Sequence, residues 1–327
     1  MRRTTQAIAA LAIGLAALVA GLTPAAAADL KPWRYGVLDA KSDAGFSFMI
    51  TRGFAERQGL KLEVVQLPAD TQLLQALVSG EVDAFEGSPG NDIVAAARGA
   101  DVKIIGCTWP GLPHAVFTRK LAAVGDLKGK NVAAGPPGSL PDLLLRILLD
   151  KSGIAAEDVK FVTIGNDLDR FKSLVAGVVD AAVVSNEVTP VATTQGVKML
   201  AAARDFAPDY PRLCIQTTGK TLGARRDDVA RFMAAEIAAL RHAVSHRDET
   251  LQLAREMARM KDDDPRPAFI YDWALQTKSI DPELTVAIAK LEYIEEQLLK
   301  TGHMTKRIDI KTMVDADVRE RALALAK

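Results

Sequence analysis

Polar side chains that could bind a small molecule stand where predicted strands give way to helices. Asp70 follows the predicted strand 61–67, and Glu86 follows a strand that begins at Val82. In open α/β sheets, ligands bind at the carboxyl ends of the strands. We therefore expect side chains at these strand ends to form one binding site.

Several predicted helices begin close to these strand ends, in segments 42–46, 88–91 and 139–141. The first turn of a helix has free N–H groups and a positive dipole end, which favour anions. Each segment could equally be an ordinary helix cap, but their occurrence in both halves of the chain favours a shared site. The predicted ligand-binding residues are Asp39, Ser42, Phe46, Glu86, Ser88, Trp109, His114, Ser139, Asn186 and Glu187.

The aromatic and the acidic residues in this set do not determine the chemical class of the ligand. Trp109 and Phe46 could stack on a ligand ring or pack in the protein. Glu86 and Glu187 would disfavour an anion unless they are paired or turned away. They would instead accept hydrogen bonds from a ligand that carries N–H groups.

The motifs of common enzyme classes are missing from the sequence. It has no Gly-x-Ser-x-Gly elbow, and the segment 135–139, GPPGS, lacks the lysine of a phosphate-binding loop. His242 and His246 are four residues apart, as metal ligands on a helix are, but we predict that they lie on the surface. We predict no catalytic residue, no metal and no cofactor.

A repeated sequence motif indicates two similar lobes. Residues 77–84 read LVSGEVDA and residues 174–181 read LVAGVVDA, each a helix end, a glycine and a strand start. Buried runs predict strands at 33–38, 61–67, 82–85, 102–107, 114–119, 131–134, 158–164, 181–185, 196–200 and 213–218. Helices are predicted at 46–58, 71–79, 92–98, 141–151, 166–177, 227–260 (broken near 245–248), 282–300 and 310–327.

Strands that alternate with helices predict an α/β protein with largely parallel sheets. We expect two lobes, each a central, mostly parallel sheet flanked by helices. The segments 114–119 and 213–218 are predicted to be crossover strands between the lobes. The predicted limits are 29–115 and 220–327 for lobe one and 116–219 for lobe two.

The N-terminus has the pattern of a cleaved signal peptide. Met1, Arg2 and Arg3 form a basic start, 7–22 is apolar, and 25–28 offers an A-x-A cleavage site. The alternative is a membrane anchor, which the short apolar run disfavours. We predict cleavage after residue 28 and export to the periplasm.

Composition and cysteines narrow the class further. The 327 residues are 49% hydrophobic and 25% charged with zero formal net charge, so the chain is globular and shows no basic excess for nucleic acid. Cys107 and Cys214 are the only cysteines. In an oxidising compartment they could form one bridge, or they could remain as two buried thiols.

Five segments in order resemble the periplasmic solute-binding proteins of ABC transporters for nitrate, sulfonates, taurine and thiamine-precursor pyrimidines. They are RGFAERQGLKLEV (52–64), LLQALVSGEVDA (73–84), ARGADVKII (97–105), DLKGKNVAAGPPGS (126–139) and LVAGVVDAAVVSNEVTP (174–190). The resemblance covers about 35–200. The segment 45–50 departs from the usual Pro-Leu-x-x-Ala pattern of the first helix.

The resemblance implies the two-lobed type II periplasmic-binding-protein fold and a receptor role. Such a receptor takes a sulfonate, an aromatic carboxylate or a pyrimidine-like molecule and passes it to the membrane subunits of an ABC importer. A monomer is expected. One alternative is an exported enzyme of thiamine-precursor or aromatic metabolism on the same scaffold, and another is a sensor domain.

Overall fold

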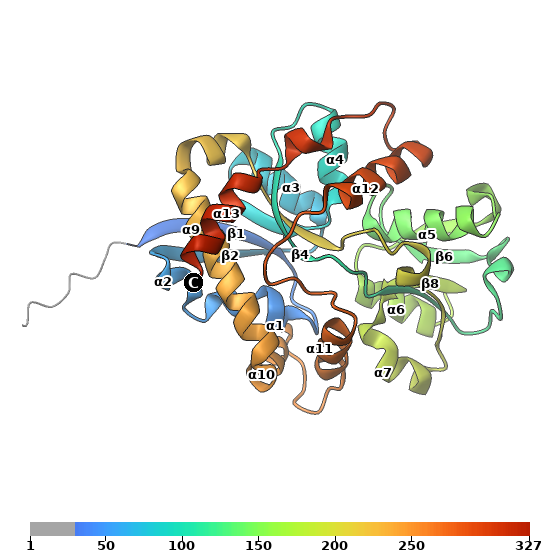
Figure 1. Cartoon of the computed structure of the whole chain (residues 1–327). Coiled ribbons are helices and arrows are strands. Elements are labelled where there is room, and N and C mark those ends of the chain that lie inside the picture. Colours follow the sequence, from blue (N-terminus) through green and yellow to red (C-terminus); the bar gives the residue numbers. More distant parts are fainter. Residues whose placement is uncertain (1–29) are drawn as a thin grey trace, which may run out of the picture.

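Two five-stranded sheets form the framework of the protein, which is described for residues 30–327 by a computed structural model (Figure 1). The predicted signal peptide lies outside the described residues. The first sheet has the order β2-β1-β3-β10-β4, and the second has the order β7-β6-β8-β5-β9. The first contains β1 (Lys31–Leu38), β2 (Leu60–Leu67), β3 (Ala84–Gly87), β4 (Lys103–Trp109) and β10 (Leu213–Thr217). The second contains β5 (His114–Thr118), β6 (Asn131–Ala134), β7 (Lys160–Thr163), β8 (Ala181–Ser185) and β9 (Lys198–Ala202).

The two sheets share one topology. In the first, β1 is parallel to β2 and β3, and β10 runs antiparallel to β3 and β4. In the second, β6 is parallel to β7 and β8, and β5 runs antiparallel to β8 and β9. The predicted α/β class and the predicted pair of similar lobes are therefore confirmed.

The two copies of the repeated sequence motif (77–84 and 174–181) occupy equivalent positions relative to the two sheets. It contains the end of α3 (Asp70–Ser79) before β3 and the end of α6 (Asp167–Val175) before β8. Its glycines, Gly80 and Gly177, have φ of 80° and 74°. This left-handed conformation is one that glycine adopts without a steric penalty, which explains the glycine in both copies.

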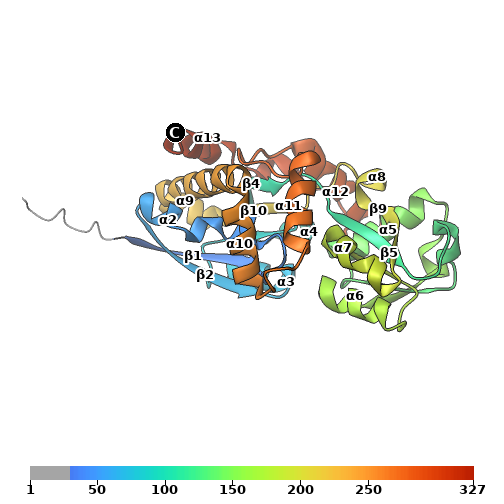
Figure 2. The same cartoon turned by 90° about the horizontal axis from the view of Figure 1, so that it is seen from below.

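Helices flank each sheet (Figures 1 and 2). The helices other than α3 and α6 are α1 (Ala44–Ser47), α2 (Phe54–Arg57), α4 (Pro89–Ala97), α5 (Leu140–Lys151), α7 (Thr189–Ala192), α8 (Ala203–Phe206), α9 (Gly219–Ser245), α10 (Arg247–Ala258), α11 (Arg266–Gln276), α12 (Ile288–Lys300) and α13 (Ala316–Leu325). The largest core lies between the first sheet and α9, where Trp33 and Tyr35 pack on Phe232 at ring-centroid distances of 5.1 and 4.8 Å. One apolar cluster joins the lobes, because it includes Ile104 of the first sheet, Val183 of the second and Leu291 of α12.

The chain crosses between the lobes next to β4 and β10. Residues 110–113 connect β4 to β5, and residues 207–212 lead from α8 into β10. The predicted lobe limits remain a prediction, but two strands near these limits belong to the sheet of the other lobe. His114, placed at the end of lobe one, begins a strand of the second sheet, and β10, placed in lobe two, pairs within the first sheet.

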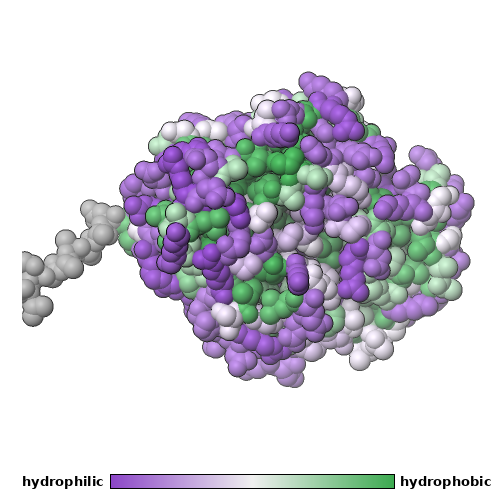
Figure 3. All heavy atoms as spheres, in the orientation of Figure 1, coloured by the Kyte–Doolittle hydropathy of each residue, from purple (hydrophilic) through white to green (hydrophobic). Residues whose placement is uncertain are grey.

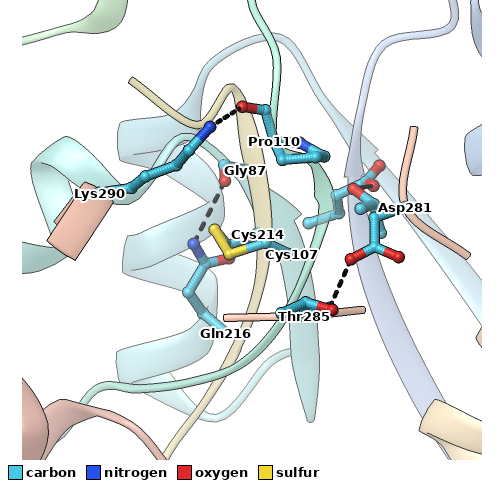
Figure 4. The surroundings of a disulfide bond; sticks show 10 residues. Gly87, Cys107, Pro110, Cys214, Gln216, Asp281, Thr285 and Lys290 are labelled. Atoms are coloured by element: carbon cyan, nitrogen blue, oxygen red, sulfur yellow. Dashed lines mark hydrogen bonds between the residues drawn. A yellow bond between two sulfur atoms is a disulfide. The ribbon is translucent and has the colours of Figure 1, made fainter. Parts of the chain in front are cut away.

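A disulfide joins the two strands that flank these crossings. Cys107 of β4 and Cys214 of β10 are bonded and buried (Figure 4). Close by, Lys290 of α12 donates to the carbonyl of Pro110, and the side chain of Gln216 donates to the carbonyl of Gly87. Of the two states that the sequence left open for the cysteines, the structure has the bridge.

Three predicted helices differ from the observed ones. The helix expected at 46–58 is divided into α1, a 3₁₀ turn (Met49–Thr51) and α2, because Gly53 adopts a left-handed φ of 82° between them. The helix expected at 282–300 begins only at Ile288, and the one expected at 310–327 is a 3₁₀ turn (Ile310–Met313) followed by α13. α11 was not predicted from the sequence. Its first turn contains Pro267, and proline is compatible with the first turn of a helix although it breaks a helix interior.

The surface of the described residues is mixed in character. On the face in Figure 3, hydrophilic residues cover most of the area, and hydrophobic ones form separate patches. None of the helices within residues 30–327 combines the length and the apolar character needed to cross a bilayer. His242 and His246 stack on each other at 3.7 Å near the α9–α10 junction, and His242 also contacts Glu249. His246 is exposed as predicted, whereas His242 is half-buried.

Candidate functional site

Charged side chains from both lobes meet where the strand ends of the two sheets face each other. The loop after β1 supplies Lys41, whose ammonium lies 2.6 Å from the carboxylate of Asp167 at the start of α6. The next residue, Ser42, donates its hydroxyl to the carboxylate of Glu187, just after β8. These contacts join residues that are 126 and 145 positions apart. We call this region the interlobe cluster; it comprises Lys41, Ser42, Asp43, Asp70, Glu86, His114, Asp167, Arg170, Asn186, Glu187 and Arg212.

Asp167 is the most strongly paired carboxylate of the interlobe cluster. Besides Lys41, it accepts from Arg170 at 2.5 Å and from the backbone N–H of Ser185 at 3.3 Å. Burial by itself raises the pKa of Asp167, but Lys41 and Arg170 outweigh burial and hold that pKa well below its usual value. Asp167 is therefore an anchored anion.

His114, the first residue of β5, lies beside Asp167. Its Nε2 is 3.9 Å from an Asp167 oxygen, and its Nδ1 is buried with no hydrogen-bond partner among the described residues. Burial lowers the pKa of His114 to about 3, although Asp167 acts in the opposite direction. The imidazole is thus neutral at physiological pH.

The second anchored pair of the interlobe cluster is Arg212 with Asp43, at 2.5 Å. Arg212 precedes β10, and its guanidinium lies over the indole of Trp109 at 4.7 Å. Burial raises the pKa of Asp43, but Arg212 and Lys41 reverse the effect and leave the pKa lowered. A planar guanidinium held against an aromatic ring is suited to a rigid ion pair.

Three other carboxylates accept only from neutral groups. Glu86 accepts from the hydroxyl of Thr108, and Asp70 accepts from the backbone N–H of Ser88 at 2.9 Å. Glu187 accepts from Ser42. Burial raises the pKa of all three, to about 7 for Glu187, where the nearby charge of Asp43 adds to the effect.

A second contact between the lobes lies near Ser88. The hydroxyls of Ser88 and Tyr210 are 3.4 Å apart, and both residues are buried. The backbone carbonyl of Gly138 in lobe two lies close to Gly90 in α4, and Ser139 follows it with a buried hydroxyl that has no partner among the described residues. This contact therefore brings two of the three predicted helix starts together.

The structure places the predicted site residues in four different settings. Ser42, Glu86, His114, Asn186 and Glu187 lie in the interlobe cluster, and Ser88 and Ser139 lie at the second contact. Asp39 is exposed, but it borders a cavity of about 20 Å³ that Glu86 and Arg212 also line. Phe46 and Trp109 are core residues: their rings meet edge to face at 5.6 Å, and Phe46 stacks on Tyr271 at 5.4 Å. Both rings are thus packed against protein groups in this structure.

The predicted set did not include several charged residues of the interlobe cluster. Lys41, Asp167 and Arg212 were not among the predicted ligand-binding residues. One signal was available, because Lys41 adjoins Ser42 at a strand end. Arg212 gave no comparable signal, since its partners are set by the folding of the crossing segment.

The architecture is the two-lobed type II periplasmic-binding-protein fold. An Escherichia coli periplasmic aliphatic sulphonate binding protein aligns with 87% of this chain and 92% of its own, at a TM-score of 0.72 and 20% identity. A Xanthomonas axonopodis pv. citri alkanesulfonate-binding protein bound to MOPS aligns with 89% of this chain and 100% of its own, at a TM-score of 0.73 and 21% identity. At these identities the likeness is one of fold.

The sequence model of the NMT1/THI5-like family matches residues 43–250, more than half of the chain, and the chain belongs to this family. An E. coli K12 protein named as an aliphatic sulfonates-binding protein is 31% identical over 156 residues, 45% of this chain and 48% of that one. A Brucella abortus protein named as a binding protein is 28% identical over 192 residues, 58% of this chain and 59% of that one. The chain thus spans about half the length of the curated relatives that it matches.

Proposed function

We propose that this chain is an exported receptor that captures a small molecule between its lobes and delivers it to the membrane subunits of an ABC importer. The observation that carries the proposal is the pair of contacts Lys41–Asp167 and Ser42–Glu187 between the strand ends of two sheets. A molecule that contacts both strand ends would favour the state in which the lobes approach each other. The receptor is proposed to act as a monomer.

Export is proposed from the basic and apolar N-terminal pattern at 1–28. The periplasmic name of the E. coli structural relative agrees with it, and so does the Cys107–Cys214 bridge, because disulfides persist in oxidising compartments. The ligand range remains that of the sequence analysis: a sulfonate, an aromatic carboxylate or a pyrimidine-like molecule. The relatives' names favour the first of these.

A thermal-shift screen of the mature protein tests this proposal. The library holds sulfonates, aromatic carboxylates, nitrate, bicarbonate, pyrimidines and amines. A ligand of the folded state raises the melting temperature with its concentration relative to Kd. We expect one chemical class to do so. The shift should be smaller in Lys41→Ala, because this variant loses the Lys41–Asp167 contact between the lobes, and unchanged in Lys61→Ala, which removes an exposed lysine of β2.

Two results together would contradict the receptor function. One is that no class raises the melting temperature. The other is that mass spectrometry of the denatured protein, purified from its own host, releases no small molecule.

A further inference from the structure

The cations of the interlobe cluster are already paired. Lys41 and Arg170 both contact Asp167, at 2.6 and 2.5 Å, and Arg212 contacts Asp43 at 2.5 Å. Arg266, which begins α11, is held by Asp264 at 2.6 Å. A ligand that relied on one of these cations would compete with a carboxylate already in place.

The carboxylates of the interlobe cluster outnumber its cations. Glu187, Glu86 and Asp70 accept only from a hydroxyl, a hydroxyl and a backbone N–H, and within residues 30–327 no Lys, Arg or His nitrogen forms an ion pair with them. Three positive charges therefore face five carboxylates, and full ionisation would leave an excess of two negative charges. The cations are Lys41, Arg170 and Arg212, and the carboxylates are Asp43, Asp70, Glu86, Asp167 and Glu187.

This surplus of carboxylates over cations decides which ligand charge the site favours. An anion placed among these groups would add negative charge where water is largely excluded, and unpaired buried charge is costly. A cation would supply the missing partner. We infer, on the basis of the proposed receptor function but in place of the sulfonate that the relatives' names favour, that the ligand is a small organic cation whose protonated nitrogen is bound by the carboxylate of Glu187.

The location of Glu187 fits this assignment. It is 5% exposed, it belongs to the second lobe, and it contacts Ser42 of the first, so a cation at its carboxylate would touch both lobes. The side-chain oxygen of the adjacent residue, Asn186, is buried with no hydrogen-bond partner among the described residues, so it offers a second free acceptor to a ligand N–H group in this cluster. A neighbouring cation would also reverse the rise in the pKa of Glu187 that burial and Asp43 cause.

The test compares ligands that are matched in shape and differ in charge. Titration calorimetry and thermal shift are run with butylammonium, butanol and butanesulfonate, and with benzamidinium, benzamide and benzoate, at millimolar concentrations. We expect the cation of at least one series to bind and its anion not to bind. Glu187→Gln should weaken binding of that cation roughly tenfold to hundredfold, as expected for a lost charge-assisted hydrogen bond.

Two further variants keep the result interpretable. Glu81→Gln changes an exposed carboxylate and should leave the affinity unchanged. Ser42→Ala should weaken cation binding less than Glu187→Gln does, because it keeps the charge. The comparison on the unmodified protein stands even if a variant is poorly folded.

The outcomes separate this inference from the receptor function. Binding of butanesulfonate or benzoate but of neither cation overturns the inference and leaves the receptor function in place. Cation binding that Glu187→Gln does not weaken also overturns it. If none of the six compounds binds, the cation assignment fails, while the receptor function still depends on the broader screen and on mass spectrometry.

Discussion

At the scale of single residues, Glu187 and His114 couple the interlobe cluster to pH in opposite directions. The pKa of Glu187 is raised to about 7, so this carboxyl releases its proton at a lower pH in the unfolded chain than in the folded one. Its contribution to the free energy of unfolding therefore falls as pH rises toward about 7. The pKa of His114 is lowered to about 3, so its contribution is lost as pH falls below its ordinary value of 6.5.

Replacement of Glu187 by glutamine removes the first of these two contributions. We expect the free energy of unfolding of Glu187→Gln to rise more steeply with pH than that of the unmodified protein between about pH 4.5 and 7. Urea unfolding across this interval measures the difference, with Glu81→Gln as the control. Parallel curves for Glu187→Gln and the unmodified protein would mean that Glu187 binds the same number of protons in the folded and the unfolded chain. The raised pKa of Glu187 would then be contradicted.

Residue types at strand ends predicted part of the site. Ser42 and Glu187 were expected because polar residues that follow parallel strands converge at their carboxyl ends. His114 was expected because it flanks a predicted crossover between the lobes. Phe46 and Trp109 were indistinguishable from ligand-stacking rings in the sequence, since an aromatic residue near a strand end suits both roles. The pairing of Lys41 with Asp167 depends on how the lobes meet, which no local pattern encodes.

At the scale of elements, the disulfide fixes the strands on both sides of the interlobe crossings. Cys107 and Cys214 are 107 residues apart, and they close a loop that contains the whole second sheet. A bridge over a loop of that length restricts the unfolded chain strongly. β4 and β10 are thus joined covalently as well as by their ladder hydrogen bonds.

Loss of this disulfide should lower the free energy of unfolding. We expect Cys107→Ala with Cys214→Ala to reduce the free energy of unfolding by about 2–5 kcal/mol. Denaturant unfolding of the double variant and of the oxidised protein gives this difference. A reducing agent should destabilise the unmodified protein and leave the double variant unchanged; equal stability of the two proteins under oxidising conditions would contradict the role of the bridge.

Strands were easier to predict than helices. The runs 131–134 and 181–185 match β6 and β8 because buried strands between turn residues leave a clear pattern. The segment 46–58 looked like one helix, since the left-handed φ of Gly53 that divides it is not visible in its apolar spacing. α11 was hidden by prolines that are tolerated in a first turn.

At the scale of the whole molecule, the C-terminal helices contact both lobes. α11 packs against the 3₁₀ turn Asn186–Val188 and α7 of the second lobe and against α10 of the first, and α12 packs against α4 and α5. Figures 1 and 2 show α11 and α12 in the region between the two lobes. A movement of the lobes relative to each other, as the proposed function requires, would therefore involve these helices as well as the crossings at 110–113 and 207–212.

The proposed receptor function requires that a ligand binds between the lobes and favours their approach. Small-angle X-ray scattering during titration with the ligand that the screen identifies measures this approach directly. We expect the radius of gyration to fall with a midpoint at the Kd from calorimetry, and Lys41→Ala to shift this midpoint to higher concentration. A saturating ligand that leaves the scattering curve unchanged, with equal affinity for the unmodified protein and Lys41→Ala, would contradict the proposed receptor function.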